Sequence, residues 1–164
     1  MEKTNLKYRK DSRTKSQFIQ DIKNSTLTEQ TLIKLYMEDL NDRKGGGYSY
    51  IDNGCDNTGE FLKDKKVTTA ADFIIIKNNT THKAEIKFSR PRITAFHIKV
   101  HQLKSYIKQD CCIIMFNAVE TDDIAYTVML PKNFQHYIDH GKKKKFWGKE
   151  CIQFKISDFE WHSV

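Results

Sequence analysis

Two neighbouring segments of β-type sequence constrain the fold of this chain more than any other feature. Residues 71–76 (ADFIII) are rich in β-branched side chains, residues 82–88 (HKAEIKF) alternate in polarity, and five polar residues separate them. We therefore expect an antiparallel hairpin. Successive side chains of a strand point to opposite faces, which divides the second strand into an apolar and a charged set: Ala84, Ile86 and Phe88, and Lys83, Glu85 and Lys87.

Helices and further strands are expected on both sides of this hairpin. The predicted helices are 16–24, 28–43, 94–109 and 134–140, and the other predicted strands are 48–51, 111–118, 124–130 and 151–156. Thr26 and Glu29 have the form of a capping box for the second helix. The order α, β, β, β, α, β and then β, α, β predicts an α/β (α+β) fold with a mixed central sheet flanked by helices. We expect one domain, 16–164, behind a basic flexible arm, 1–15.

Asp72 and Glu85 are the residues that most clearly carry chemistry. Pairing the two strands of the hairpin places Asp72 across from Glu85 and Lys87, so that two carboxylates and an ammonium converge. Oxygen ligands of this kind hold Mg²⁺ or Mn²⁺, which neutralises a phosphate and lowers the pKa of bound water. A lysine beside the cation can orient that water, deprotonate it or stabilise the phosphate. The grouping predicts phosphodiester hydrolysis; the alternative is three charges on a solvated hairpin face.

The order of elements around these residues resembles the PD-(D/E)XK nuclease superfamily. Its core is a helix, a three-strand meander with Asp on the second strand and E-x-K on the third, then a helix and a fourth strand. The resemblance spans about 28–118, and Ala71 stands at the variable position that is proline in the family name. It implies a restriction-endonuclease-like αβββαβ core. It also implies catalytic residues Asp72, Glu85 and Lys87 and a metal site of Asp72, Glu85 and Ile86.

The crossover helix carries a further match. Gln102 and Tyr106 form the Q-x3-Y pattern of nuclease domains similar to those of bacterial recombination exonucleases. With Lys99 they are expected to flank the apolar stripe of the helix at 94–109. From there they could contact the metal site or the DNA backbone, and the resemblance implies a catalytic role for Gln102.

A glutamate from the first helix completes the metal site in archaeal Holliday-junction resolvases. Glu29 fits this role, because it shares a helix face with Leu32, Tyr36 and Leu40, which should face the sheet. A glutamate on the buried side needs a partner such as a metal. The alternative is that Glu29 only caps its helix, and Glu60 is the second choice for the role.

The chain is basic, with a formal net charge of +7, which favours nucleic acid as a partner. Basic residues gather in the arm at 1–15 and at 142–145, although such runs also occur as solvated tails or loop tips. Arg90 and Arg92 directly follow the E-x-K strand. The residues expected to contact DNA are Arg90, Arg92, Lys99, Tyr106, Lys143 and Lys144.

The leading prediction is therefore a Mg²⁺- or Mn²⁺-dependent DNA endonuclease. Its size is similar to that of phage resolvases, small restriction enzymes and homing endonucleases, so cleavage of branched structures and of specific sequences are both open. The alternatives are an exonuclease of the same fold, which the Q-x3-Y pattern favours, and a DNA-binding protein without catalysis. Cleavage of both strands would favour a homodimer.

The remaining features favour a cytoplasmic protein of a prokaryotic or phage-infected cell, with no membrane partner. No apolar run reaches the ~20 residues of a membrane helix, and the first residues lack the apolar core of a secretion signal. The adjacent Cys111 and Cys112 lie in an apolar run and are expected to be reduced core residues. Two pairs of histidines have i, i+4 spacing, but without further ligands they are not expected to bind zinc: His97 with His101, and His136 with His140.

Overall fold

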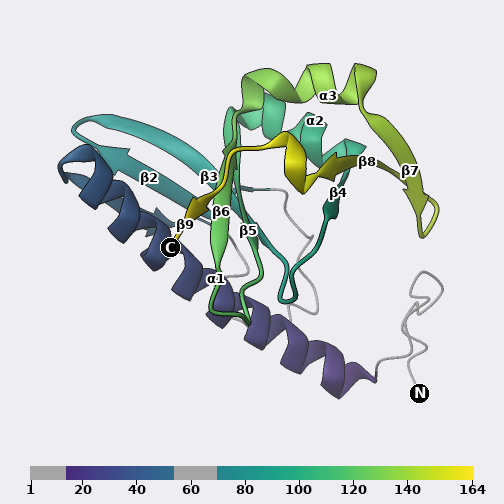
Figure 1. The fold of residues 1–164 in the computed structure, drawn as a ribbon, viewed down its shortest axis with the longest axis horizontal. Helices are drawn as coiled ribbons and strands as arrows, with labels where there is room; N and C mark the ends of the chain where they lie inside the picture. The colour runs from purple at the N-terminus through teal and green to yellow at the C-terminus, as the bar shows by residue number, and fades with distance from the viewer. Residues whose placement is uncertain (1–13, 54–69) are drawn as a thin grey trace.

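Three helices and two separate sheets make up the computed structural model, which describes residues 14–53 and 70–164 (Figure 1). The helices are α1 (Lys15–Lys44), α2 (Val100–Gln109) and α3 (Phe134–His140), with 3-10 turns η2 (Pro131–Asn133) and η3 (Ile156–Asp158). The strands are β1 (Tyr48–Asp52), β2 (Phe73–Lys77), β3 (Thr80–Phe88), β4 (Ala95–Lys99), β5 (Cys111–Asn117), β6 (Ala125–Met129), β7 (Lys142–Phe146), β8 (Lys149–Lys155) and β9 (His162–Ser163). The predicted α/β (α+β) class is confirmed.

The larger sheet is mixed and has six strands in the order β1-β2-β3-β5-β6-β9. β1, β2 and β3 form an antiparallel meander, and β3 runs parallel to β5. Parallel neighbours need a crossover connection, which β4 and α2 provide. β6 and β9 extend the sheet in antiparallel fashion beyond β5. The predicted meander, crossover helix and following strand are therefore present.

The β2–β3 hairpin has the predicted pairing and a tighter turn than predicted. Lys77 pairs with Thr80, so only Asn78 and Asn79 form the turn, in place of a five-residue loop. Asn78 has a φ of 52°, a left-handed conformation that asparagine tolerates well. β2 begins one residue after Asp72, which places this carboxylate at the end of the strand instead of within it.

The two helices predicted before the hairpin are a single helix, α1, of 30 residues. Its capping box is formed by Thr14 and Gln17, and not by Thr26 and Glu29. Ser25 and Thr26, which lie between the two predicted helices, disfavour a helix by at most about 0.7 kcal/mol each. This is too little to end a helix whose later turns pack on the sheet. Its predicted end at the glycines is confirmed, because Gly45 closes it with a left-handed φ of 77°.

The helix predicted at 94–109 begins only at Val100. The residues before it form β4, in which Phe96 and Ile98 are buried while His97 is exposed. This is the alternation of a strand. The prediction was wrong because Phe96 also lies in helical register with Val100 and Leu103, so that one apolar residue fits both periods.

β4, β8 and β7 form a second, antiparallel sheet in that order. β8 begins at Lys149, two residues earlier than predicted. β7 contains the basic run at 142–145, which the sequence indicated only as a charged block. Consecutive lysines suit an edge strand, because their charges oppose the pairing of a further strand.

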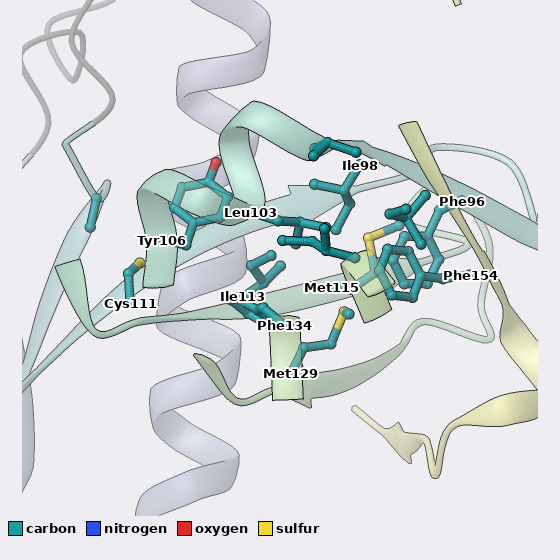
Figure 2. Close-up of a cluster of buried hydrophobic side chains, with 14 residues drawn as sticks. Phe96, Ile98, Leu103, Tyr106, Cys111, Ile113, Met115, Met129, Phe134 and Phe154 are labelled. Carbon is teal, nitrogen blue, oxygen red and sulfur yellow. The ribbon is translucent and has the colours of Figure 1, made fainter. Parts of the chain in front are cut away.

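The larger sheet has an apolar cluster on each face, and both include residues of β5. One cluster joins the sheet to α1: Leu32, Ile33, Tyr36, Met37, Leu40, Phe73, Ile75, Ala84, Ile86, Ile114, Phe116 and Tyr126. The other joins it to α2, α3 and the small sheet (Figure 2), and includes Phe96, Leu103, Tyr106, Cys111, Ile113, Met115, Phe134 and Phe154. β5 is therefore buried on both sides, as its apolar sequence predicts. No helix in the described part of the chain is long and apolar enough to span a membrane.

We predict that Asn117 at the end of β5 holds the entry to the small sheet in place. Its side chain is 6% exposed, accepts a hydrogen bond from the Ile93 N–H (3.0 Å) and donates one to the Ile93 carbonyl (3.1 Å). Asn117→Ala should lower the free energy of unfolding by about 1–3 kcal/mol, because the Ile93 backbone loses both partners. Urea denaturation measures this loss. The control Asn133→Ala removes an exposed asparagine and should change stability by less than about 0.5 kcal/mol. Equal losses of stability in the two variants would contradict this role of Asn117.

Candidate active site

Three charged side chains meet where β2 begins and β3 approaches its end. One residue beyond the first β2–β3 pair, Asp72 lies opposite Glu85. Asp72 Oδ2 accepts a hydrogen bond from the backbone N–H of Ile86, with an O–N distance of 3.1 Å. Glu85 and Lys87 share one side of β3, as the alternation predicts, and their side chains are in direct contact. The predicted convergence of the three residues is present.

Glu85 is the most tightly held of these groups. It is 8% exposed, and its Oε1 accepts hydrogen bonds from Lys87 Nζ at 2.6 Å and from the Tyr106 hydroxyl at 2.8 Å. Lys87 Nζ also lies 6.0 Å from the centre of the Tyr106 ring. A buried carboxylate requires such donors to offset its loss of hydration. The arrangement therefore fixes Oε1 through both partners, and neither of them uses Oε2.

The position of Tyr106 differs from the prediction. It was expected beside the apolar stripe of its helix, but it is 3% exposed and lies at one end of the apolar cluster (Figure 2). The buried face of α2 consists of Val100, Leu103 and Tyr106, while Ile107 is only partly buried. Tyr106 is therefore part of the apolar stripe and does not flank it, because its ring is apolar and only its hydroxyl needs a polar partner. Glu85 gives the hydroxyl the buried partner that a core tyrosine needs.

Burial and like charges disfavour the ionised form of Asp72. Burial, Glu85 and Glu29 together raise the pKa of Asp72 from 3.8 to about 8, against the opposing effects of the Ile86 N–H and of Lys87. Burial by itself lowers the pKa of Lys87, but the carboxylates of Glu85, Asp72 and Glu29 outweigh it, and the net shift is upward. Lys87 therefore keeps its proton at neutral pH. The site has more acidic groups than its one ammonium can balance.

Glu29 of α1 belongs to the same electrostatic site. Its half-buried side chain is close enough to Asp72 and Lys87 to raise the pKa of both. It lies well inside α1, so the alternative interpretation as a helix cap is wrong. Glu60, the second choice for this role, lies outside the described residues.

The donor set fits a hard divalent cation with few protein ligands. Within residues 14–53 and 70–164, no three His, Cys, Asp or Glu side chains gather as a complete metal-ligand cluster. Mg²⁺ needs only one or two carboxylates and keeps several waters, and Asp72 and Glu85 can provide these. Ile86, the third predicted ligand, could contribute only its carbonyl oxygen. A cation would relieve the repulsion that raises the pKa of Asp72, which is why we regard the residues as a fit.

A pocket of about 410 Å³ opens beside Lys87 and contains two further predicted residues. Lys99, at the N-cap of α2, and Gln102, in its first turn, line the pocket together with Lys87. His97 and Trp147 line it from the small sheet. The structure thus brings Lys99 and Gln102 to the same cavity as Lys87, while Tyr106 contacts Glu85 from the core.

Arg90 and Arg92 extend toward the β5–β6 loop. Arg90 Nη1 lies 2.9 Å from Glu120 Oε1, and Arg92 Nη2 lies 2.7 Å from Asp123 Oδ2. Both ion pairs are exposed, and exposed pairs contribute only about 0–1 kcal/mol to stability. Either arginine could therefore exchange its carboxylate for a phosphate at little cost, and their contact with DNA stays a prediction.

Lys143 and Lys144 are neighbours on β7 and therefore point to opposite faces of the small sheet. Lys143 Nζ lies 3.6 Å from Glu150. Lys144 pairs with Cys151, which lines the pocket, and its charge lowers the pKa of His97 in addition to the effect of burial. Most of the basic arm at 1–15 lies outside the described residues, which begin at 14.

The histidine pairs do not alter this assignment. His97 belongs to β4 and His101 to α2, so they are not on one helical face as their spacing suggested. His136 and His140 do lie on one helix, α3, with ring centres 4.8 Å apart. Neither pair belongs to a metal-ligand cluster of the described residues.

Comparison of the chain with protein-family models, with curated proteins and with solved structures gives no match. What the site can do is therefore inferred from its own chemistry and geometry.

Two features of the site have no clear signal in the sequence. Tyr106 had the predicted spacing from Gln102, but its bond to Glu85 depends on how α2 packs against β3. Trp147 reaches the pocket from the turn between β7 and β8, about 60 residues after Lys87 in the chain. Only pairing of β8 with β4 brings it there, and β4 was predicted as part of a helix.

We predict that Asp72→Asn stabilises the metal-free protein, and more so at high pH. The folded protein holds a proton on Asp72 up to about pH 8, whereas the unfolded chain releases it near pH 4. Stability due to the protonated form is thus complete below pH 4 and is lost as the pH rises through about 8. Asparagine has no such charge and can still accept the Ile86 N–H. The melting temperature of Asp72→Asn should exceed that of the parent by a few degrees at about pH 8.5 and by little at about pH 4.5. For a chain of this size, each kcal/mol of stability corresponds to about 2–4 °C.

Asp139→Asn, which makes the same change on the exposed face of α3, is the control and should show no such growth with pH. Added Mg²⁺ should raise the melting temperature of the parent and not that of Asp72→Asn, because binding to the folded form stabilises it. A difference between parent and Asp72→Asn that is the same at both pH values would show that Asp72 is ionised throughout.

Proposed function

We propose that this chain is a metal-dependent deoxyribonuclease that hydrolyses phosphodiester bonds, with a restriction-endonuclease-like fold. The observation that carries the proposal is the convergence of Asp72 with the Glu85–Lys87 ion pair at one end of the β2–β3 hairpin. The order of the elements supports it: α1, the β1–β2–β3 meander, the crossover helix α2, and β5 parallel to β3. The small sheet is an addition to that core.

The carboxylates would hold the cation and the lysine would act on the reacting phosphate. Mg²⁺ or Mn²⁺, held by Asp72, Glu85 and the main chain of Ile86, would supply positive charge at the scissile phosphate and a more acidic water. Lys87 keeps its proton in this environment, so it donates hydrogen bonds and positive charge instead of accepting a proton. That favours orienting the water or stabilising the phosphate over deprotonating the water, among the roles open to this lysine.

Tyr106 and Glu29 have supporting roles. The Tyr106 hydroxyl and Lys87 both bind Oε1 of Glu85, which orients the carboxylate and leaves Oε2 as the oxygen that we assign to the cation. Tyr106 is thus a positioning residue and not a DNA contact. Glu29 adds negative charge beside Asp72, which increases the affinity of the site for a cation.

An endonuclease accounts for the basic residues better than the other two candidates. Lys99 and Gln102 line the same pocket as Lys87, and we take this pocket as the path of a strand that passes the site without presenting an end. The exonuclease alternative keeps the support of the Q-x3-Y pattern, and a protein without catalysis would have no use for the repulsion between Asp72 and Glu85. Cleavage of both strands would require two sites, for which we propose a homodimer.

Supercoiled plasmid, linear duplex and a four-way junction, each with and without Mg²⁺ or Mn²⁺, test the proposal. A closed circle has no end, so its nicking indicates an endonuclease, and degradation of only the linear DNA indicates an exonuclease. Cleavage of none of the three with either cation would contradict the nuclease proposal. Asp72→Asn and Glu85→Gln should abolish cleavage while DNA binding persists.

Lys87→Met is predicted to reduce the single-turnover cleavage rate by at least about 10²-fold and DNA affinity by only a few-fold. One charged contact that strengthens in the transition state contributes about 10²–10³ in rate. Lys83→Met is the matched control: Lys83 lies on the same side of β3, is exposed, and precedes Glu85 by two residues. It removes the same charge and should leave the rate within about three-fold of the parent. If Lys87→Met loses affinity and rate in equal measure, Lys87 only binds the phosphate.

A further inference from the structure

The small sheet has one face on which every formally charged residue is a lysine. Cys151 of β8 pairs with Lys99 of β4 on one side and with Lys144 of β7 on the other, and directly paired residues share a face. Extending this register along the three strands gives the lysines of this face, which we call the lysine face: Lys99, Lys142, Lys144, Lys149 and Lys155. Within the described strands β4, β7 and β8, no acidic residue occupies this face.

The opposite face of the small sheet has a different character. Its residues from β4 and β8 are buried in the core: Phe96, Ile98, Ile152 and Phe154. At the edge of this opposite face, Lys143 Nζ lies 3.6 Å from Glu150 Oε1, and the glutamate reduces the net charge of the face. The basic character is therefore a property of one face, and not a consequence of a lysine-rich strand alone.

The pocket beside Lys87 connects the lysine face to the candidate active site. It is lined by Lys99 and His97 of β4, by Phe146 at the end of β7, and by Lys87 on β3. The His97 and Phe146 rings lie 4.6 Å apart. Its volume of about 410 Å³ is within the range of small-molecule sites, and its wall combines aromatic rings with ammonium groups.

Trp147 is an exposed residue of the pocket lining. At 77% exposure it is the most exposed large hydrophobic side chain of the described residues, and it also lines the pocket. It occupies the β7–β8 turn with Gly148, and this hairpin extends away from the larger sheet (Figure 1). Its φ of 49° is unusual for a bulky residue, for which a turn would more commonly have asparagine. The hairpin turn accounts for this backbone angle, and the exposure of the indole leaves its ring faces accessible to a ligand.

We propose that this pocket binds an unpaired nucleotide of the DNA strand next to the cleaved phosphate, with its base stacked on Trp147 and its neighbouring phosphates on the lysine face. The inference rests on the proposed nuclease function and specifies its substrate class. A base inside a duplex is covered on both faces by its neighbours, so only an unstacked base can offer a face to an indole. The preferred substrates are therefore single-stranded, forked or branched DNA, and not intact duplex.

Binding without metal tests the subsite independently of cleavage. Trp147 and Trp161 are the two tryptophans of the chain, and Trp161 is half-buried with its Nε1 donating to the Ile156 carbonyl. Trp161→Phe thus leaves Trp147 as the one fluorescent indole. In EDTA, a single-stranded oligonucleotide and a forked duplex should quench this emission strongly, and a blunt duplex of the same sequence should quench it weakly. Equal quenching by all three would overturn the proposal.

Affinity measurements by anisotropy of labelled DNA, with Trp161 intact, complete the test. Trp147→Ala should weaken binding of single-stranded and forked DNA by about ten-fold or more and change blunt-duplex binding by less than about two-fold. Trp147→Phe should restore most of the loss, because a phenyl ring also stacks. Leu130→Ala, which removes another exposed apolar side chain, is the control and should change neither. If Trp147→Ala weakens all DNA equally, or none, the stacking assignment is wrong.

Two double variants with the same loss of charge test the lysine face. Lys142→Ala with Lys144→Ala should lower single-strand affinity and flatten its salt dependence by up to about two in slope, because each phosphate contact releases about one counterion. Lys143→Ala with Lys145→Ala should have a clearly smaller effect. Equal effects would mean that the strand does not follow the lysine face. If DNA quenches Trp147 but is cleaved under no condition, the nuclease proposal is wrong and the stacking subsite stands. If DNA is cleaved but Trp147→Ala binds it as tightly as the parent, the stacking subsite is wrong and the nuclease proposal stands.

Discussion

The candidate active site at the end of β3 depends on hydrogen-bond donors that compensate the buried carboxylates. Glu85 is nearly removed from water, and its Oε1 is satisfied by Lys87 and by Tyr106, which come from a strand and from a helix. Asp72 has a main-chain donor but is raised in pKa to about 8 by burial and by its acidic neighbours. A surplus of acidic groups is costly in the protein alone, and a bound cation would offset that cost.

The rest of the fold provides the surroundings that this centre requires. β5 is buried on both faces, so it forms a rigid support for the parallel strand β3. On one face of the sheet α1 closes an apolar layer, and on the other α2 brings Tyr106 onto Glu85. The small sheet packs beside α2 and leaves a pocket at Lys87 instead of sealing it. We propose this pocket, together with the lysine face, as the path of the DNA strand.

The sequence predicted secondary structure correctly where its hydrophobic residues fit either the helical or the strand periodicity, but not both. The alternation of 82–88 placed Glu85 and Lys87 on one side, and the hairpin placed Asp72 opposite them. α3 and β5 also agree closely with the prediction, because their sequences have one possible interpretation. The prediction was wrong where two signals compete. Phe96 fits both a strand and a helix, and the polar residues before Glu29 were interpreted as a break although their helix penalties are small.

The sequence by itself determined the hairpin, the three charged residues at its end and the order of most elements, because strand alternation and turn chemistry act over a few neighbouring residues. Only the tertiary structure decided which side chains complete the site. The bond from Tyr106 to Glu85 requires the rotation of α2 about its axis, and Glu29 approaches Asp72 only through the packing of α1 on the sheet. Trp147 and the lysine face reach the pocket through pairing of β4 with β8, more than 50 residues apart in the chain. Such contacts depend on burial across the whole core, and no local pattern contains that information.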